Sequence, residues 1–131
     1  MSALVAAECK ETVERLVLVY PAFSIKDDWV KMFPSLEDMP KELDFWGMKL
    51  GHPYMEGLYD LDVYETIARY EGPVAIFHGD SDQIVPVSYS EKALDAYKHA
   101  DLTVYPGEGH GFSPETMRQM LDAIGTMLKG R

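Results

Sequence analysis

Three short, continuous runs of apolar residues constrain the fold of this chain more than any other feature of its sequence. They cover residues 16–20, 74–78 and 102–105, and each is followed directly by a proline or a glycine. A strand with one face in water alternates apolar and polar residues, whereas a strand that is covered on both faces does not. The three runs therefore predict strands of a parallel sheet.

Helical patterns follow the second and third runs. Ser88 and Glu91 have the spacing of a capping box, which predicts that Ser88 is the N-cap of a helix. Ser113 precedes a proline, a common helix start, and apolar residues then repeat at helical spacing. Residues 1–10 are rich in Ala and Leu and are also expected to be helical. The alternation of strands and helices indicates right-handed βαβ crossovers and an α/β fold.

The segment of residues 24–70 follows neither pattern. It mixes acids and prolines with many aromatic and sulfur-containing residues, and short helices and turns are expected there. An insertion of this length between two core strands is too long for a simple connection. We therefore expect three parts: a helix and strand in residues 1–23, a mostly helical insertion in residues 24–70, and the rest of the core in residues 71–131.

Two polar loops follow neighbouring predicted strands. Residues 78–86 read His-Gly-Asp-Ser-Asp-Gln-Ile-Val-Pro, and residues 106–112 read Pro-Gly-Glu-Gly-His-Gly-Phe. Open parallel sheets bind ligands outside the carboxyl ends of their strands, where both loops are expected. We expect Asp82 and His110 to meet there. A carboxylate that accepts a hydrogen bond from Nδ1–H fixes the tautomer of a catalytic histidine and stabilises its imidazolium.

The order of these motifs resembles the last third of the α/β-hydrolases, a family of serine esterases and lipases. The shared pattern is a strand, Gly-Asp-x-Asp-x-x-Val-Pro, a helix, a strand and Gly-x-Gly-His-Gly-Phe. The resemblance implies that Asp82 is the acid and His110 the base of a Ser-Asp-His triad. It also implies that residues 24–70 are a lid, and it covers nearly the whole chain. Within the family, the sequence looks closest to bacterial esterases of the cinnamoyl or feruloyl type.

The sequence departs from the family in one large respect. The nucleophile elbow, Gly-x-Ser-x-Gly, does not occur in the 131 residues. By the resemblance, Met1 falls within the helix that follows the elbow. We therefore expect a C-terminal half that is truncated after the elbow, lacks the nucleophilic serine and part of the oxyanion hole, and is inactive alone. Ser81 is a poor substitute, because its Gly-Asp-Ser-Asp-Gln context lacks the final glycine and belongs to the loop of the acid.

Each candidate residue also has a purely structural interpretation. Asp80 and Asp82 could both be turn formers, and His110 could be a surface residue of a glycine-rich loop. His78 ends a buried strand and is expected to be structural. The large side chains of the insertion are more often core packing, although an esterase lid should offer apolar contacts to an acyl group. The candidates for that contact are Trp29, Phe33, Trp46 and Met48.

Composition limits the partners of the chain. The formal net charge is −10, which repels phosphate backbones and anionic membranes, and no apolar run is long enough to span a bilayer. The single cysteine, Cys9, cannot form an intrachain disulfide, and no secretion signal is visible, so a cytoplasmic location is expected. The sequence contains no His-x-x-x-His or Cys-x-x-Cys spacing, so neither a metal nor another cofactor is expected.

Two functions remain open at this point. The first is that of a carboxylic ester hydrolase, which acts on a small-molecule ester through an acyl-enzyme. The second is a non-catalytic assembly module, because the first visible strand would leave a sheet edge open to pairing with another chain; a homo-oligomer is therefore expected. A small flavodoxin-like binding domain is disfavoured, since no glycine-rich phosphate-binding turn precedes residue 16.

Overall fold

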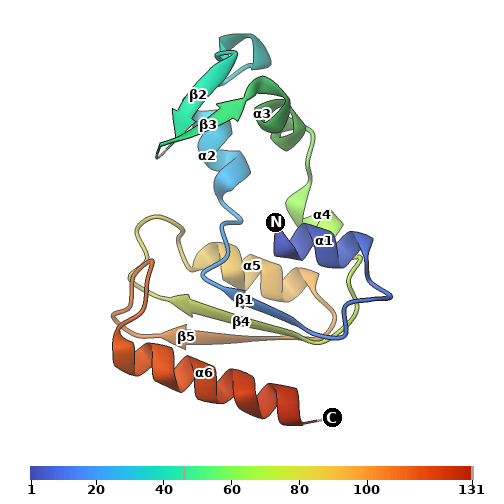
Figure 1. Ribbon diagram of the computed structural model, residues 1–131, viewed down its shortest axis with the longest axis vertical. Helices are drawn as coiled ribbons and strands as arrows, with labels where there is room; N and C mark the ends of the chain where they lie inside the picture. The colour runs from blue at the N-terminus through green and yellow to red at the C-terminus, as the bar shows by residue number, and fades with distance from the viewer. Residues whose placement is uncertain (46, 131) are drawn as a thin grey trace. The chain divides into compact units, whose positions relative to one another are not determined.

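The computed structural model describes every residue from 1 to 130 except Trp46, and the chain divides into two compact units (Figure 1). The core unit consists of Met1–Phe23 and Val63–Arg131, and the insertion unit consists of Ser24–Asp62. The predicted lid segment extends further along the chain than the insertion unit does. Its function as a lid stays a prediction.

A three-stranded parallel sheet forms the centre of the core unit. Strands β1 (Leu16–Val19), β4 (Val74–Gly79) and β5 (Ala100–Tyr105) lie in the order β1-β4-β5. Val74 pairs with Leu16 on one side and with Ala100 on the other. The predicted α/β fold with a parallel sheet is therefore confirmed.

The three strands differ in how much of their surface is covered. Every residue of the central strand β4 is buried except Ala75, which is partly buried. In β1, Leu16 and Leu18 are buried while the alternate residues are only partly covered, and β5 is mainly exposed or partly buried. The expectation that all three runs are covered on both faces is thus correct for β4 alone. The reason is that β1 and β5 are the edges of the sheet in the part of the chain that the structure describes.

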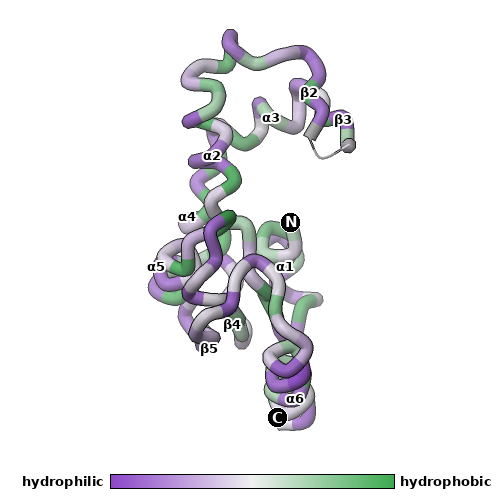
Figure 2. Tube along the Cα trace, turned by 90° about the vertical axis from the view of Figure 1, so that its left-hand side faces the viewer, coloured by the Kyte–Doolittle hydropathy of each residue, from purple (hydrophilic) through white to green (hydrophobic). Residues whose placement is uncertain are grey.

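Helices cover both faces of the sheet (Figure 1). Helices α1 (Ser2–Glu8), α4 (Val63–Ile67) and α5 (Ser88–Ala96) lie on one face, and α6 (Pro114–Lys129) lies on the other. Helix α6 mixes hydrophobic and hydrophilic residues along its length, as Figure 2 shows, which suits a helix with one face toward a sheet. In the described residues, none of the helices combines the length and the apolar character needed to cross a membrane.

The two predicted helix starts have different outcomes. Ser113 is the N-cap of α6, and its hydroxyl accepts a hydrogen bond from the Thr116 backbone N–H, as expected. The prediction for Ser88 is wrong: α5 begins at Ser88, Val87 occupies the N-cap position, and no side chain caps this end. The serine of this helix with a buried role is Ser90, whose hydroxyl lies 2.7 Å from His78 Nδ1.

The insertion unit has a small core of its own. Trp29, Met39, Met55 and Leu58 are buried together, and the Phe33 ring stacks on Trp29 with a centroid distance of 5.9 Å. The elements of this unit are α2 (Ile25–Met32), the 3-10 helix η1 (Leu36–Asp38), β2 (Glu42–Phe45), β3 (Met48–Gly51) and α3 (His52–Tyr59).

The β-hairpin of the insertion unit corrects the expectation that this segment holds only helices and turns. Strands β2 and β3 pair antiparallel, with Leu43 opposite Leu50. The sequence of β2, Glu-Leu-Asp-Phe, does alternate polar and apolar residues, but the run is short and was not recognised as a strand. Gly47 completes the turn with a φ of +78°, and its N–H donates to Asp44 Oδ1 at 2.9 Å.

Arg15 ties the start of β1 to the end of α6. Its guanidinium donates to the carbonyl oxygens of Leu128 at 3.0 Å and of Gly130 at 2.6 Å, two acceptors that a helix C-terminus leaves without intrahelical partners. We predict that Arg15→Ala lowers the free energy of unfolding by about 1 kcal/mol. Urea titration measures this, with the exposed Arg118→Ala on the same helix as control. Equal stability of the two variants would contradict the prediction.

Candidate active site

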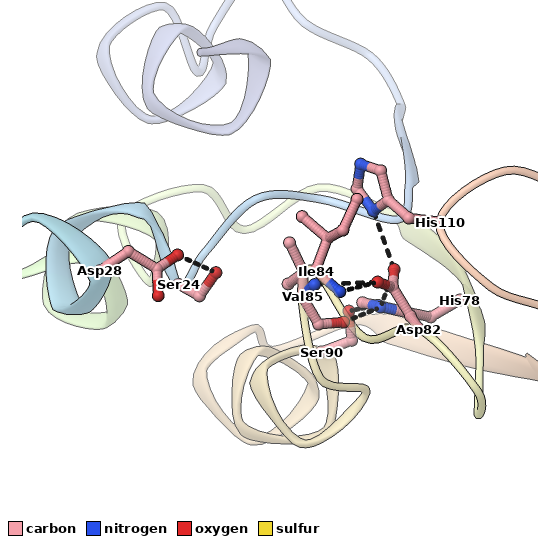
Figure 3. A network of polar contacts seen from close by, with 8 residues as sticks. All are labelled: Ser24, Asp28, His78, Asp82, Ile84, Val85, Ser90 and His110. Atoms are coloured by element: carbon pink, nitrogen blue, oxygen red, sulfur yellow. Dashed lines mark hydrogen bonds and ion pairs between the residues drawn. The ribbon is translucent and has the colours of Figure 1, made fainter. Parts of the chain in front are cut away.

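The acid loop follows the central strand β4 and is organised around Asp82. The Asp82 side chain is fully buried, and its Oδ1 accepts hydrogen bonds from the backbone N–H groups of Ile84 at 2.9 Å and Val85 at 2.8 Å. Aspartate commonly accepts from backbone groups two or three residues further on, which is why it suits such a turn. The turn places the second oxygen, Oδ2, toward two histidine side chains (Figure 3).

The histidine loop follows β5 and packs closely against the end of β4. A Cβ atom added to Gly79 would lie 2.1 Å from the Glu108 carbonyl oxygen, so only glycine allows this approach of the two backbones. Asp80 joins the loops as well, because its Oδ1 accepts from the Gly107 N–H at 2.7 Å. Of the two structural roles expected for Asp80, a turn residue or a brace between loops, this hydrogen bond supports the brace.

Glu108 connects the histidine loop to the start of α6. Its carboxylate accepts hydrogen bonds from the Ser113 N–H at 3.0 Å, from the Ser113 hydroxyl at 2.6 Å and from the Thr116 hydroxyl at 2.6 Å. The hydrogen bonds from the Ser113 and Thr116 side chains lower the pKa of Glu108 from its ordinary value. The loop that carries His110 is therefore held at both ends, by β5 and by the helix N-terminus.

His110 reaches Asp82 across these loops. His110 Nδ1 lies 2.9 Å from Asp82 Oδ2, and because the carboxylate can only accept, Nδ1–H is the donor (Figure 3). The His110 side chain is 25% exposed, and its other ring nitrogen, Nε2, points away from Asp82. The structure thus brings together the two residues that the sequence proposed as acid and base. Their catalytic role stays a prediction.

The environment of Asp82 favours its ionised form. Burial by itself raises the pKa of this carboxyl, but the hydrogen bonds from the Val85 N–H, from His110 and from the Ile84 N–H outweigh it. The net result is a pKa below the ordinary value of 3.8. At neutral pH, Asp82 is therefore a negatively charged acceptor for the imidazole N–H.

Tyr20 belongs to the surroundings of His110, and sequence reasoning missed it. Its ring centroid lies 4.7 Å from that of His110 and 5.2 Å from that of Phe112. Tyr20 has a φ of +34°, a conformation that is rare for a residue with a side chain and is often found at functional sites. The available signal was an aromatic residue at the carboxyl end of a predicted strand, directly before Pro21.

The remaining predicted residues lie elsewhere. Ser81 is exposed, and its hydroxyl donates to Asp80 Oδ1 at 3.2 Å. In the insertion unit, Trp29 is buried in the local core and Met48 is 59% exposed. Trp46 lies outside the described residues. Among the residues that the structure does describe, no three His, Cys, Asp or Glu side chains are grouped as ligands for a metal ion.

Comparison with known proteins identifies similar sequences, although no protein-family model matches the chain. A non-heme haloperoxidase from Rhodococcus erythropolis is 43% identical over 53 residues, which are 40% of this chain and 19% of that protein. A bifunctional esterase/perhydrolase from Acinetobacter calcoaceticus is 33% identical over 79 residues, which are 55% of this chain and 29% of that protein.

Solved structures match over nearly the whole chain. Est1E from Butyrivibrio proteoclasticus superposes with a TM-score of 0.82 and 29% identity, over 97% of this chain and 55% of Est1E. Mouse alpha/beta hydrolase domain-containing protein 10 has a TM-score of 0.71 over 97% of this chain and 56% of its own, and at 16% identity it supports the fold alone. The chain therefore has the fold of about half of an α/β-hydrolase. The predicted resemblance to the α/β-hydrolases, with esterases among the relatives, is confirmed.

The lowered pKa of Asp82 predicts how stability depends on pH. A carboxyl whose pKa is lower in the folded state stabilises the protein above its unfolded pKa, and this contribution is lost as the pH falls through the folded value. We predict that Asp82→Asn costs about 2 kcal/mol of unfolding free energy at neutral pH, because the amide N–H group cannot accept from the histidines. The difference between the two proteins should be full above about pH 5 and should shrink as the pH falls below about 4, the ordinary pKa of an aspartate.

Denaturant titrations at several pH values measure this difference. Ser81→Ala, which removes an exposed hydroxyl of the same loop but no charge, is the matched control, and its difference from the parent chain should not vary over the same range. A difference for Asp82→Asn that is constant or grows toward acid would show that the folded chain does not hold this carboxyl ionised.

Proposed function

We propose that Asp82 and His110 are the acid and the base of a Ser-Asp-His triad in a carboxylic ester hydrolase that acts on small-molecule esters. The observation that carries the proposal is the 2.9 Å hydrogen bond from His110 Nδ1 to a buried, ionised carboxylate beyond the carboxyl ends of β4 and β5. The similarity to an esterase/perhydrolase and to Est1E, whose structure with bound ferulic acid also matches at 28% identity, supports this class of substrate.

In this proposal, each side chain has a separate task. Asp82 holds His110 in the tautomer whose proton is on Nδ1, which leaves Nε2 with a lone pair directed away from the carboxylate. Nε2 would accept the proton of a serine hydroxyl as that oxygen attacks the ester carbonyl, and would return the proton to the leaving alcohol. Nε2 would then take a proton from the water that hydrolyses the acyl-enzyme. The negative charge of Asp82 stabilises the imidazolium at each stage.

These 131 residues do not supply the nucleophile. They contain no Gly-x-Ser-x-Gly elbow, and Ser81 is hydrogen-bonded to Asp80 at the exposed side of the acid loop. The chain also spans only 55% of Est1E and 19% to 29% of the curated relatives, so a complete triad would need a serine from outside the present sequence. We propose that the chain by itself is inactive toward esters.

The insertion unit, in this proposal, is the lid of the hydrolase. Of the residues that the sequence offered for contact with an acyl group, Met48 has an exposed side chain, whereas the burial of Trp29 favours a packing role. Phe33 is partly buried against Trp29 and is available for contact only at its open side. The assignment of the lid rests on the resemblance and on the position of the unit between β1 and β4 in the sequence.

Ester hydrolysis tests the proposed function directly. We expect the 131-residue chain to hydrolyse p-nitrophenyl acetate no faster than buffer does. A chimera in which this chain replaces the matching part of Est1E would, by the family resemblance, regain the serine elbow, and it should hydrolyse the ester. His110→Ala or Asp82→Asn in the chimera should lower kcat by about 10³-fold or more.

His99→Ala is the matched control for the chimera, because His99 is an exposed histidine at the start of β5, away from the loops of the site. Its turnover should equal that of the parent chimera. Turnover by the 131-residue chain that His110→Ala abolishes would refute the proposed inactivity. A chimera that melts cooperatively but hydrolyses no ester, or whose activity survives loss of His110, would refute the triad.

A second candidate function is assembly through the sheet edge at β1. Leu16 donates its N–H group to the carbonyl of Pro73, directly before β4, and Tyr20 donates to the Phe77 carbonyl within β4. In a parallel pair, every second residue of a strand bonds to the neighbouring strand. The N–H groups of Val17 and Val19 therefore point away from β4. On that side, the described part of the chain provides no further strand. An open edge of this kind can pair with a strand of a second copy.

Light scattering distinguishes assembly from a simple monomer. The assembly function predicts a dimer or a larger oligomer, and Val17→Pro should shift it toward monomer because proline removes an N–H from the open edge. Val17→Thr, which keeps the N–H and the branched side chain, should assemble like the parent chain. A parent chain that is a monodisperse monomer with a cooperative melt would refute this function.

A further inference from the structure

A second histidine, His78, contacts the same carboxylate as His110. His78 is part of β4, it is completely buried, and both of its ring nitrogens have partners. Nδ1 lies 2.7 Å from the Ser90 hydroxyl of α5, whereas Nε2 lies 3.1 Å from Asp82 Oδ2 and 2.8 Å from the Val85 carbonyl oxygen (Figure 3). The ring therefore links the central strand, helix α5 and the acid loop.

The partners of His78 define where its proton lies. The Val85 carbonyl can only accept a hydrogen bond, and the ionised Asp82 carboxylate can only accept as well. Nε2 must therefore carry the proton, which it shares between these two oxygens. In the neutral ring, Nδ1 is then an acceptor, and the Ser90 hydroxyl is the donor to it. This tautomer gives both ring nitrogens of His78 a hydrogen-bond partner without a positive charge on the ring.

The contact with His78 adds a fourth hydrogen bond to the Asp82 carboxylate. Asp82 Oδ1 accepts from the N–H groups of Ile84 and Val85, and Oδ2 accepts from His110 Nδ1 and from His78 Nε2. The two backbone donors bind only Oδ1. The buried His78 ring, which has partners at both nitrogens, supplies a donor to Oδ2, the oxygen that His110 uses.

We propose that His78 is a positioning residue, which in its neutral Nε2–H form holds Asp82 Oδ2 in place for the hydrogen bond from His110. The proposal deepens the proposed function, on which it rests for its relevance to catalysis. Ser90 acts one step further away, because its hydroxyl donates to the Nδ1 atom that this tautomer leaves without a proton. The relay Ser90–His78–Asp82–His110 thus runs from a buried face of α5 to the solvent-accessible ring of the base.

A purely structural role for His78 makes a different prediction. If the ring only anchors α5 and the acid loop to β4, its loss should lower stability without a specific change at His110. We therefore compare His78→Gln, whose amide N–H can reach the position of ring Nε2, with His78→Leu, which fills the space but donates nothing. Ser90→Ala, which removes the hydroxyl donor to Nδ1, is the third variant.

Nitrogen and proton NMR of the histidine rings in the 131-residue chain tests the proposal. We expect His78 to carry its proton on Nε2 and His110 to carry its proton on Nδ1, with a low-field Nδ1–H resonance for His110. His78→Leu should lose that low-field resonance while the chain stays folded by circular dichroism, and His78→Gln should keep it. If the His110 resonance is unchanged in His78→Leu, His78 has only a structural role and the proposal is overturned.

If His78→Leu does not fold, the proposal can still be tested by measuring the tautomer of His78 in the unaltered chain. A proton on Nδ1 instead of Nε2 would overturn it without any variant, and Ser90→Ala should leave the proton on Nε2 because Val85 and Asp82 still accept from it. The positioning role of His78 and the proposed function can also be refuted independently of each other. Ring spectra as predicted, together with a folded Est1E chimera that hydrolyses no ester, would retain the positioning role of His78 and reject the proposed function.

Discussion

The rest of the site depends on the hydrogen bonds that the buried carboxylate of Asp82 accepts. A carboxylate without water is strongly destabilising unless hydrogen bonds replace its hydration. Here two backbone N–H groups and two imidazole rings provide that replacement. The hydrogen bonds from Val85, His110 and Ile84 outweigh burial and keep the pKa of Asp82 below its ordinary value. Because a buried carboxylate needs several hydrogen-bond donors, three separate segments meet at this one side chain: the end of β4, the acid loop and the histidine loop.

The backbone around the site is shaped to allow this meeting. Gly79 lets the end of β4 approach the Glu108 carbonyl, and Asp80 joins the acid loop to Gly107. Glu108 in turn fastens the histidine loop to Ser113 at the start of α6. Each of these contacts lies next to the Asp82–His110 pair, so the position of His110 is set by packing and hydrogen bonds within the core unit.

The order of strands and loops in the sequence was enough to predict the parallel sheet and the Asp82–His110 contact, but not the further contacts that packing adds. Continuous apolar runs were sufficient for the parallel sheet, and the order of strands and loops was sufficient to bring Asp82 and His110 to one edge. Ser88 was predicted as an N-cap from local spacing alone, whereas Val87 occupies that position and the helix places Ser90 against His78. The proximity of Tyr20 to His110 and the second contact of Asp82 with His78 likewise arise only when β1, β4 and β5 are assembled.

A crystal structure of the 131-residue chain near neutral pH tests the central claim most directly, because the claim concerns the distances from one oxygen atom to two rings. Our account predicts that His110 Nδ1 and His78 Nε2 both lie within hydrogen-bonding distance of the same buried oxygen of Asp82. An Asp82 side chain turned into solvent, or a His110 ring well out of reach of it, would contradict the account.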